Sequence, residues 1–425
     1  MDIEELYKIY LQNPSIQTDT RKLQKGDLFF ALKGASFNGN AFAKNAIDAG
    51  AGYAIIDDKN YLIQGKTILV DDVLTTLQLL AKHHREQFNI PFIAITGSNG
   101  KTTTKELIHV VLSSSYKTYT TEGNLNNHIG VPLTILKIRN DAQMAVIEMG
   151  ANHLNEIASY CKYALPTHGI ITNCGKAHLE GFGGEEGVRK GKGELFDHLR
   201  QHNGIAFIMR DYDYLRQMSE GISTIYTYGT READIVGYIS QTDPFLETSF
   251  EKGFKGKIKT NLVGSYNLPN VLAAVAVGKF FSIGDDKIEE SIEAYIPSNS
   301  RSQLLQKGSN KIILDAYNAN PSSMKAAIEN FAKMKGDSKI LALGAMAELG
   351  EESLQEHADI IEEIKKYPWH QVILVGGDFI KLKHPYQQFG SPLEAGEWMK
   401  GKVENAYLLI KGSRSMQMEK VLDYL

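Results

Sequence analysis

The stretch from Phe92 to Lys105 constrains the fold of this chain more than any other part of the sequence. It reads Phe-Ile-Ala-Ile-Thr-Gly-Ser-Asn-Gly-Lys-Thr-Thr-Thr-Lys, which is a short apolar run, a glycine-bounded turn and the beginning of a helix-forming segment. Backbone N–H groups in such a turn point toward a bound anion, and the helix dipole adds positive potential there. The stretch therefore predicts a phosphate-binding loop in which Lys101 reaches the terminal phosphates and Thr102 ligates Mg²⁺.

The match to the full phosphate-loop pattern is incomplete, because the outer glycine of that pattern falls at position 95, which is Ile95. An ordinary glycine-rich turn with a surface lysine is the alternative interpretation. The apolar strand before the turn, the helix after it and the Lys-Thr pair favour ATP binding, without indicating what the ATP is used for. The loop residues expected to contact the nucleotide are Gly97, Ser98, Asn99, Gly100, Lys101, Thr102 and Thr103.

Composition and charge exclude several classes of protein. A chain of 425 residues has room for roughly two to four domains. Its content of 43% hydrophobic and 23% charged residues is typical of a globular protein in water. The net charge of -4 gives no electrostatic case for binding nucleic acid or an anionic membrane. The two cysteines, Cys161 and Cys174, are too few for a disulfide framework.

The sequence also gives no sign of secretion or of membrane insertion. The N-terminus carries acidic residues where a signal peptide needs basic ones. The longest apolar run, Val271 to Phe281, is interrupted by Lys279 and is shorter than a membrane span. We therefore expect a cytoplasmic protein that does not insert into a membrane.

Residues 1–85 predict a small α/β domain ahead of the phosphate loop. The expected elements are a strand within Gly26–Gly34, a helix at Phe37–Gly50 and a strand at Tyr53–Ile56. The residues expected on one face of that helix are Phe42, Ala46, Ile47 and Ala49. Arg21 is either a surface charge or a group that holds a phosphate or carboxylate of a second ligand.

Residues 86–298 predict a central domain with a parallel, doubly wound sheet, because apolar strands alternate with helical segments. The expected strands are Phe92–Thr96, Met144–Met149, His168–Asn173, Ile205–Met209 and Ser223–Tyr228. Asp234–Leu262 reads as a more irregular β-rich arm, and a helix is expected at Asn267–Phe281. Polar groups follow the carboxyl ends of these strands, where α/β sheets bind ligands.

Residues 299–425 alternate again between strands and helices and predict a third, Rossmann-like domain after a linker at Pro297–Ser300. The expected strands are Lys311–Asp315, Lys339–Leu343, Gln371–Val375 and Tyr407–Ile410. The expected helices are Ser322–Met334 and Ser353–Lys365, with a last helix closing the chain.

Several residue types suggest chemistry, each beside a plainer interpretation. Glu148 ends an apolar strand and is placed as an Mg²⁺ ligand or as an ordinary strand-end acid. His178 follows another strand, and a lone histidine is usually structural or exposed. Gly181–Gly187 reads as a mobile loop, and residue types alone place Lys192 on the solvated basic face of a helix.

Four motifs together resemble, in order, those of the Mur ligases, which are ATP-dependent peptide-bond-forming enzymes of bacterial cell-wall synthesis. They are Thr-Gly-Ser-Asn-Gly-Lys-Thr-Thr (96–103), Ile-Glu-Met-Gly (147–150), Ala-His-Leu-Glu (177–180) and Lys-Gly-Glu-Leu-Phe (192–196). Five further stretches are similar to the members that join D-alanyl-D-alanine to UDP-N-acetylmuramoyl-tripeptide. These stretches are 26–34, 122–134, 315–324, 347–350 and 411–414. The resemblance spans nearly the whole chain.

The resemblance implies a catalytic set of Lys101, Glu148, His178 and Lys192. In the family, the lysine that matches Lys192 is carbamylated and becomes a carboxylate-like metal ligand. It would hold a second Mg²⁺ with His178, while Thr102 and Glu148 serve the Mg²⁺ on the ATP phosphates. A substrate carboxylate would attack the γ-phosphate, and the incoming amine would then displace phosphate from the acyl phosphate.

The resemblance also distributes the ligands over the three domains. The first domain would bind the uridine nucleotide through Thr20 and Arg21. The residues implied for the muramoyl-peptide path are Asn124, Asn126 and Asn127, and those implied for D-alanyl-D-alanine are Lys411, Ser413 and Arg414. The residues implied for the nucleotide, besides the loop, are Asn267, Asn270, Arg301, Asp315 and Asn318. Helix capping is the plainer interpretation of Asn267 and Asn270.

The chain departs from the family pattern at two positions. Tyr266 replaces the usual histidine, so no role is carried over to it, and Ala345 replaces an acid. The alternatives are a sister ligase that adds one diamino acid, a folate-polyglutamylating relative and a nucleotide-dependent binding protein that has lost ligation. The Asp-Asn-Pro-Arg signature of the sister enzyme is absent from the sequence. We expect a monomer.

Overall fold

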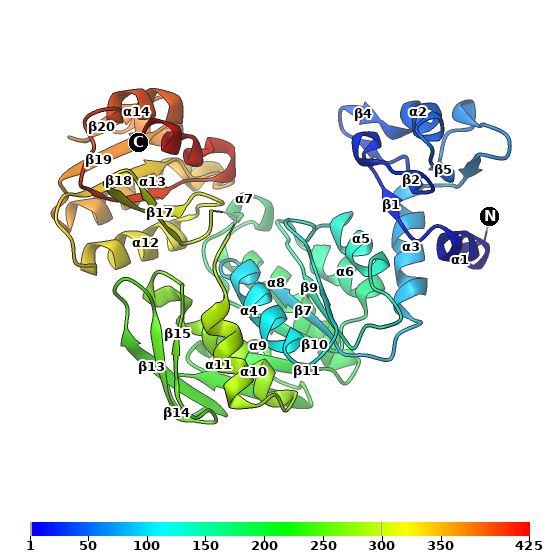
Figure 1. The fold of residues 1–425 in the computed structure, drawn as a ribbon, viewed down its shortest axis with the longest axis horizontal. Coiled ribbons are helices and arrows are strands. Elements are labelled where there is room, and N and C mark those ends of the chain that lie inside the picture. The colour runs from blue at the N-terminus through cyan, green and yellow to red at the C-terminus, as the bar shows by residue number, and fades with distance from the viewer. Residues whose placement is uncertain (1, 299) are drawn as a thin grey trace. The chain divides into compact units, whose positions relative to one another are not determined.

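The structure is a computed structural model that describes residues 2–298 and 300–425, so Asn299 of the expected linker lies outside the described residues. Its strands form three main sheets of four, nine and six strands, together with a two-stranded hairpin. Figure 1 shows these elements coloured along the chain. Within the described residues, no helix combines the length and the apolar character needed to cross a bilayer.

Contacts between Cα atoms divide the chain into two compact units. The first holds the chain up to Ala94 together with Tyr116–Gly150 and Asn155–Gly169. The second holds Ile95–Ser115, Ala151–Leu154 and Ile170–Leu425. The phosphate loop therefore belongs to the same unit as the C-terminal third of the chain, whereas Glu148 belongs to the other unit.

The N-terminal region contains a parallel four-stranded sheet in the order β1-β2-β5-β6. Its strands are β1 (Ile16–Gln17), β2 (Leu28–Phe30), β5 (Tyr53–Ile56) and β6 (Thr67–Leu69), with the hairpin β3 (Lys33–Gly34) and β4 (Phe37–Asn38). Its helices are α1 (Ile3–Gln12), α2 (Ala43–Asp48) and α3 (Val73–Arg85). The predicted strand Tyr53–Ile56 is confirmed.

The helix predicted at Phe37–Gly50 is wrong in its first half. Phe37 pairs in the hairpin, and Asn38 accepts a hydrogen bond from the backbone N–H of Asn40, which opens a 3-10 turn instead of an α-helix. The α-helix α2 begins only at Ala43, and its buried residues are Ala43 and Ala46. Of the four residues predicted on one face, Ala46 is buried and Ile47 packs against the same apolar cluster, whereas Phe42 and Ala49 are exposed.

The central sheet has nine strands in the order β15-β14-β13-β12-β11-β10-β7-β9-β8. They are β7 (Phe92–Thr96), β8 (Thr118–Thr120), β9 (Met144–Glu148), β10 (His168–Ile171), β11 (Ile205–Met209), β12 (Thr224–Gly229), β13 (Ile235–Gln241), β14 (Glu247–Lys252) and β15 (Lys257–Lys259). Every residue of β7 and of β9 is buried, as expected for strands covered on both faces. The five predicted strands are confirmed within two residues at their ends.

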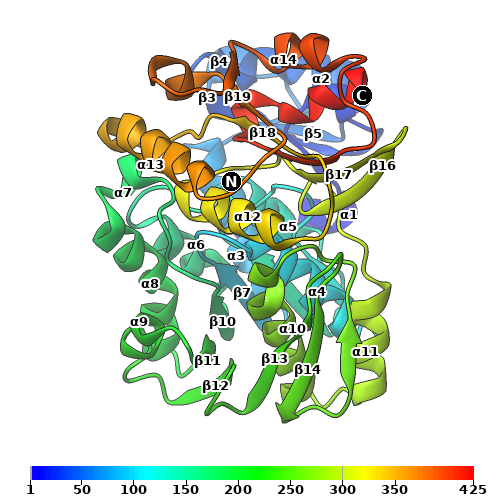
Figure 2. The same cartoon turned by 90° about the vertical axis from the view of Figure 1, so that its left-hand side faces the viewer.

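The predicted β-rich arm is more regular than expected. β12 and β13 pair in parallel, whereas β13, β14 and β15 pair antiparallel and extend the sheet. The helices of this region are α4 (Lys101–Ser113), α5 (Gly130–Leu136), α6 (Glu156–Ala164), α7 (Leu179–Phe182), α8 (Glu185–Gln201), α9 (Asp213–Met218), α10 (Leu268–Phe280) and α11 (Asp285–Ala294). α10 packs on α4 and against β11, β12 and β13 (Figure 2). The loop predicted at Gly181–Gly187 is instead the end of α7 and the beginning of α8.

The C-terminal region is a six-stranded sheet in the order β16-β17-β21-β18-β19-β20. Its strands are β16 (Gln303–Lys307), β17 (Asn310–Asp315), β18 (Lys339–Gly344), β19 (Gln371–Val375), β20 (Gln387–Phe389) and β21 (Tyr407–Lys411). Its helices are α12 (Pro321–Lys333), α13 (Ser353–Lys365) and α14 (Pro392–Met399). Only β16 pairs antiparallel, so the predicted Rossmann-like character is confirmed. The predicted last helix is two 3-10 segments, Arg414–Met416 and Met418–Tyr424.

The sheet of this region lies between two helical layers. In both views α14 lies on one side of the sheet, and α12 and α13 lie on the other (Figures 1 and 2). Alternate residues of the strands explain this arrangement, since Ile312, Ile340 and Ile373 join one apolar cluster with Met399 of α14. The carboxyl ends of the parallel strands are left free to hold polar groups.

Candidate nucleotide site

The phosphate loop lies between β7 and α4 and is held by two glycines with positive φ. Gly97 has φ 141° and Gly100 has φ 80°, a region that a side chain rarely allows. Space forbids a side chain as well, because a Cβ on Gly97 would overlap the Thr172 hydroxyl. Lys101 Nζ curls back over the loop and donates to the carbonyls of Gly97 at 2.6 Å and Ser98 at 3.2 Å. Helix α4 begins at Lys101.

The segment that follows β10, residues 172–175, holds the phosphate loop through several hydrogen bonds. Asn173 accepts from the backbone N–H of Asn99 at 3.0 Å, and its amide donates to the Asn99 carbonyl at 3.0 Å. The Thr172 hydroxyl donates to the same carbonyl at 2.6 Å. The Ser98 hydroxyl donates to the Gly175 carbonyl at 2.9 Å. These hydrogen bonds pair the polar groups of Ser98 and Asn99 with the segment after β10. Thr102, in the first turn of α4, is buried.

Asn267 and Asn270 lie behind the loop and are both buried. Asn267 occupies the N-cap position of α10, as the helix-capping interpretation predicts. Its side chain makes no capping hydrogen bond, so that part of the interpretation is wrong. Its amide donates to the Val263 carbonyl at 2.9 Å, and the amide of Asn270 donates to Asn267 Oδ1 at 2.8 Å. Tyr266, the departure from the family pattern, shares a hydrogen bond of 3.1 Å with the Ser302 hydroxyl.

Glu148 ends β9 with only 1% of its surface exposed. Asn126 donates to its Oε1 at 2.8 Å, which fixes the carboxylate in one orientation. Asn127 has a different role, because its Oδ1 accepts from the backbone N–H groups of Ile129 and Gly130 and turns the chain into α5. Asn124 is exposed. Of the three asparagines expected on the muramoyl-peptide path, one therefore orients the predicted metal ligand.

Lys192 is 1% exposed, so its residue-type interpretation as a solvated base is wrong. It lies on the buried face of α8, where its Nζ donates to the Ala151 carbonyl at 2.7 Å. The ring of Phe182 lies 4.8 Å from Nζ. Burial raises the pKa of the neighbouring Cys174 thiol to about 12, although the charges of Lys192 and Arg189 lower it. A buried lysine on a helix is unusual unless its amine has a partner or a chemical role.

His178 and Glu348 face one another in an unusual backbone conformation. Both have left-handed φ, at 54° and 62°. Nδ1 of His178 lies against the Glu348 carboxylate, and this contact lowers the pKa of that carboxyl. Strained residues of this kind gather at functional sites. The sequence motif that contains Glu348 carried the family resemblance, but Glu348 itself was not among the predicted site residues.

The predicted residues of the C-terminal region fall into two groups at the ends of β17 and β21. Lys411 is 2% exposed and donates to Asp315 at 2.6 Å and to the Asn318 carbonyl at 3.2 Å. Ser413 is buried as well. Arg301 stacks on the ring of Tyr317 at 3.7 Å, and its buried Nε makes no hydrogen bond.

Arg414 lies over the same Tyr317 ring at 5.9 Å and pairs with Glu419 at 3.0 Å. Its side chain is 63% exposed. Lys411 and Arg414, which the resemblance assigns to one dipeptide, therefore lie in different surroundings. Lys411 pairs with Asp315, which the resemblance assigns to the nucleotide.

Residues of the C-terminal region also contact the phosphate loop and the segment after β10. Asn320 donates to Asn99 Oδ1 at 2.8 Å. The backbone N–H of Lys176 donates to the Ser322 hydroxyl at 3.2 Å, and its Nζ donates to Glu356 at 2.6 Å. Sequence reasoning missed these contacts. Asn320 and Lys176 stand inside or beside quoted motifs, whereas Glu356 lies on an acid-rich helix and gave no signal.

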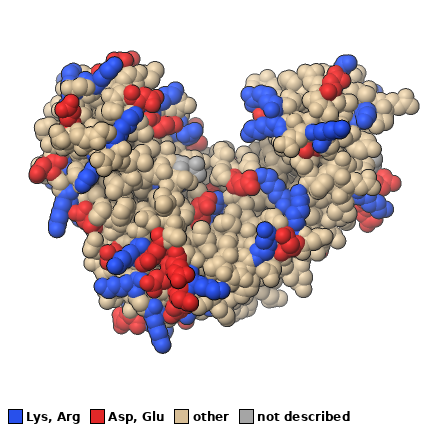
Figure 3. All heavy atoms as spheres, in the orientation of Figure 1, with Lys and Arg blue, Asp and Glu red and all other residues tan. Residues whose placement is uncertain are grey.

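Thr20 and Arg21 form a 3-10 turn on the surface of the N-terminal region. The Arg21 side chain is 86% exposed and pairs with Asp19 at 2.7 Å. A hydrogen bond from Arg21 lowers the pKa of Asp19 to about 2. On the face shown in Figure 3, acidic and basic side chains are interspersed.

Thr102 and Glu148 are each of a residue type that can bind a magnesium ion together with phosphate oxygens. Among residues 2–298 and 300–425, no group of three or more His, Cys, Asp or Glu side chains gathers as a metal cage. Mg²⁺ is commonly bound by one or two protein oxygens together with substrate phosphates and water. The buried Thr102 hydroxyl and the oriented Glu148 carboxylate, which belong to different compact units, are each an oxygen of that kind.

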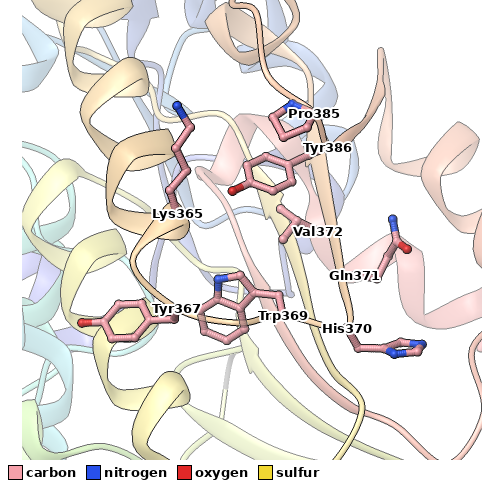
Figure 4. Close-up of a pocket in the computed structure, with 8 residues that line it drawn as sticks. All are labelled: Lys365, Tyr367, Trp369, His370, Gln371, Val372, Pro385 and Tyr386. Carbon is pink, nitrogen blue, oxygen red and sulfur yellow. The ribbon is translucent and has the colours of Figure 1, made fainter.

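A separate pocket of about 280 Å³ lies at the amino end of β19, remote from the loop ends that carry these groups (Figure 4). It is lined by Lys365, Tyr367, Trp369, His370, Gln371, Val372, Pro385 and Tyr386. Ligands of open α/β sheets bind at the carboxyl ends of the strands. Within the described part of the chain, we therefore place the candidate site at the phosphate loop and not in this pocket.

The fold and the site together define an α/β protein with a nucleotide-type phosphate loop. The sequence profile of the Mur ligase middle domain matches residues 95–278. The profile of the Mur ligase glutamate ligase domain matches residues 300–414, and that of the Mur ligase family catalytic domain matches residues 14–85. The matches cover most of the chain, and the chain belongs to the Mur ligase family.

Three relatives extend this similarity over nearly the full length. The UDP-N-acetylmuramoyl-tripeptide–D-alanyl-D-alanine ligase of Bacillus subtilis (strain 168) is 34% identical, covering 99% of this chain and 96% of that protein. The crystal structure of MurF from Acinetobacter baumannii has a TM-score of 0.88 at 30% identity, covering 96% of this chain and 92% of that chain. MurF from Thermotoga maritima, solved in complex with ADP, has a TM-score of 0.87 at 27% identity and covers 97% of each chain.

Proposed function

We propose that this chain is an ATP-dependent ligase that joins D-alanyl-D-alanine to UDP-N-acetylmuramoyl-tripeptide in the synthesis of peptidoglycan precursors. The observation that carries the proposal is the similarity, over nearly the whole chain, to relatives whose names state this activity. The phosphate loop supports the use of ATP, because Lys101 follows a glycine-bounded turn between a buried strand and the N-terminus of α4, where anions bind.

The chemistry divides between binding and two transfer steps. A carboxylate oxygen of the tripeptide attacks the γ-phosphorus, the bond to the bridging oxygen breaks, and ADP leaves. The amine of the dipeptide then attacks the acyl carbon and loses a proton, and phosphate leaves as the peptide bond forms. Lys101 would stabilise the charge on the phosphoryl oxygens during the first step.

Two Mg²⁺ ions, when bound, would neutralise the phosphoryl and carboxylate charges that these steps bring together. Thr102 and Glu148 would hold one ion, and His178 and carbamylated Lys192 would hold the other. The position of Lys192 supports the carbamate, since its Nζ lies inside the fold, 2.7 Å from the Ala151 carbonyl, and not in solvent. Glu348 is an orienting neighbour of His178 in this proposal.

The three regions would divide the ligands between them. Residues 1–85 would bind the UDP end through Thr20 and Arg21, and residues 86–298 would bind ATP and the peptide. Residues 299–425 would bind D-alanyl-D-alanine near Arg414 and contribute Arg301 and Asp315 to the nucleotide. The exposure of Arg414, in contrast to the buried Lys411, makes it the better candidate for a dipeptide carboxylate.

The test is phosphate release from ATP by the purified chain. We expect release with UDP-N-acetylmuramoyl-tripeptide and D-alanyl-D-alanine together, and only weak release when the dipeptide is omitted. Release that depends on a single diamino acid and the muramoyl-dipeptide would favour the sister reaction. ATP binding without release under any of these conditions would favour a binding protein.

The carbamate has its own test. Replacing Lys192 by Ala should abolish ligation while ADP binding, measured by calorimetry, stays close to that of the wild type. Added short carboxylates should restore part of the activity, because they can occupy the space of the carbamate. Normal turnover by Lys192→Ala would contradict the assignment.

A further inference from the structure

The first turn of α4 is tied to α10 by a hydrogen bond between two buried side chains. The Thr104 hydroxyl donates to Asn270 Oδ1 at 3.0 Å, and the exposed fractions of the two residues are 0% and 7%. A threonine inside a helix usually bonds back to the carbonyl four residues earlier. Here the Gly100 carbonyl accepts from the backbone N–H of Thr104, and the hydroxyl points to the neighbouring helix instead.

Asn270 is fixed at its other end as well. Its amide donates to Asn267 Oδ1 at 2.8 Å, and the amide of Asn267 donates to the Val263 carbonyl at 2.9 Å. The chain of bonds therefore runs from α4 through two asparagines to the backbone before α10. Both polar atoms of the Asn270 carboxamide are used inside the protein, which holds its oxygen in one place.

That oxygen lies directly against the last residue of the phosphate loop. A Cβ on Gly100 would come within 2.6 Å of Asn270 Oδ1. Gly100 adopts φ 80° and is the N-cap of α4, immediately before Lys101 and Thr102. Asn270 thus packs against the residue that immediately precedes Lys101 and the first turn of α4.

We propose that Asn270 and Thr104 are positioning residues that hold the end of the phosphate loop in its anion-binding conformation. The proposal rests on the proposed use of ATP, but it concerns the triphosphate and not the base. The family resemblance places Asn267, the first asparagine of the stretch 264–270, near the adenine. The bonds of Asn270 and Thr104 instead act on the part of the loop that every nucleotide shares.

The test compares ligands with and without a base. Thr104→Val keeps the shape of the side chain and removes the donor, which leaves Asn270 Oδ1 without that bond. We expect the dissociation constants of ADP, GDP and inorganic tripolyphosphate, measured with Mg²⁺ by calorimetry, to rise by the same factor. That factor should be about three- to tenfold, the range that one buried hydrogen bond spans. Thr104→Ser keeps the donor and should bind all three ligands as the wild type does.

A matched control separates positioning from general destabilisation. Thr260→Val removes another buried hydroxyl, which donates to the Leu246 carbonyl at 2.8 Å in the β-rich arm. It should lower the melting temperature to a similar extent and leave all three dissociation constants unchanged. Equal ligand losses in Thr260→Val and Thr104→Val would overturn the proposal.

Two further outcomes would also overturn it. A loss confined to ADP would assign the asparagines to the adenine, and a wild-type protein that does not bind tripolyphosphate would show that the loop is not an autonomous anion site. Phosphate release is measured on the same wild-type protein. Anion binding without ligation would therefore refute the proposed function and leave the role of Asn270 standing.

Discussion

Replacing Lys176 by Met should weaken the contact between the segment after β10 and α13. Lys176 Nζ lies 2.6 Å from Glu356, and the exposed fractions of the two side chains are 39% and 7%. The hydrogen bond to Glu356 raises the pKa of Lys176, so the amine stays charged at neutral pH. Methionine keeps most of the aliphatic stem and removes the charge. The nearly buried carboxylate would then lose its cation.

The magnitude lies between those of buried and surface ion pairs. Breaking a buried pair by removing one partner costs about 3–5 kcal/mol, whereas an exposed pair contributes about 0–1 kcal/mol. The lysine end is partly exposed, and Glu356 lies in the first turn of α13, where the helix dipole favours a negative charge by about 0.3–1 kcal/mol. We therefore expect a loss of about 1–2 kcal/mol, which corresponds to about a five- to thirtyfold weakening.

The assay is a double-mutant cycle read from the KM for ATP and from thermal unfolding. Lys176→Met should raise the KM, because the same segment supports the phosphate loop through Asn173 and Gly175. Glu356→Gln leaves an exposed lysine and a neutral amide, so its effect should be smaller. The double variant should recover much of the loss, since it leaves no buried charge without a partner.

A matched control and a clear refutation accompany this cycle. Lys44 is an exposed lysine whose paired acid, Asp48, lies 4.0 Å away and is exposed as well, so Lys44→Met should change neither quantity. Strict additivity of Lys176→Met and Glu356→Gln would refute the reasoning. An effect on the melting temperature with an unchanged KM would show that the contact supports only the fold.

Three further changes have defined outcomes. Burial lowers the pKa of His168 to about 4, so the unfolded chain binds a proton at this residue more readily than the folded chain does. The free energy of unfolding should therefore fall by about 3 kcal/mol as the pH drops from 6.5 to 4. Urea titrations should show a weaker pH dependence of this free energy in His168→Gln. Lys411→Ala should destabilise the C-terminal region by about 3–5 kcal/mol, because Asp315 loses its buried partner, and a raised KM for the dipeptide with an unchanged melting temperature would argue for direct substrate contact instead. Ala345→Asp should destabilise the protein by about 2 kcal/mol or more on thermal unfolding, because Ala345 is 2% exposed and packs against Gly377.

The strands of the fold were predictable where the sequence is continuously apolar. β5, β7, β11 and β19 agree with their predicted bounds at both ends, because buried parallel strands carry an uninterrupted signal. The helix predicted from Phe37 failed because one side-chain bond of Asn38 turns the chain locally. The regular pairing of the β-rich arm was not predictable from residue types, since it depends on contacts between strands.

The site shows the same division between local and tertiary signals. The phosphate loop was predictable, because its function requires glycines, a lysine and a threonine at fixed spacing. The buried position of Lys192 was not predictable, because it depends on the Ala151 carbonyl and the Phe182 ring. The local sequence pattern does not indicate these contacts. The role of Lys192 came from the family resemblance alone. The partnership of Lys176 with Glu356 joins positions far apart in sequence, and neither residue type distinguishes it from an ordinary surface charge.

The two glycines of the phosphate loop have a consequence for how such a chain can change over generations. Gly97 is packed against Thr172, and Gly100 against Asn270, so each glycine is matched to a side chain from a distant segment. A side chain at either position would have to adopt a left-handed φ as well as displace its distant neighbour, so a smaller neighbour alone would not make it acceptable. The two positions should therefore stay glycine even in lineages where Thr172 or Asn270 is replaced by a smaller residue.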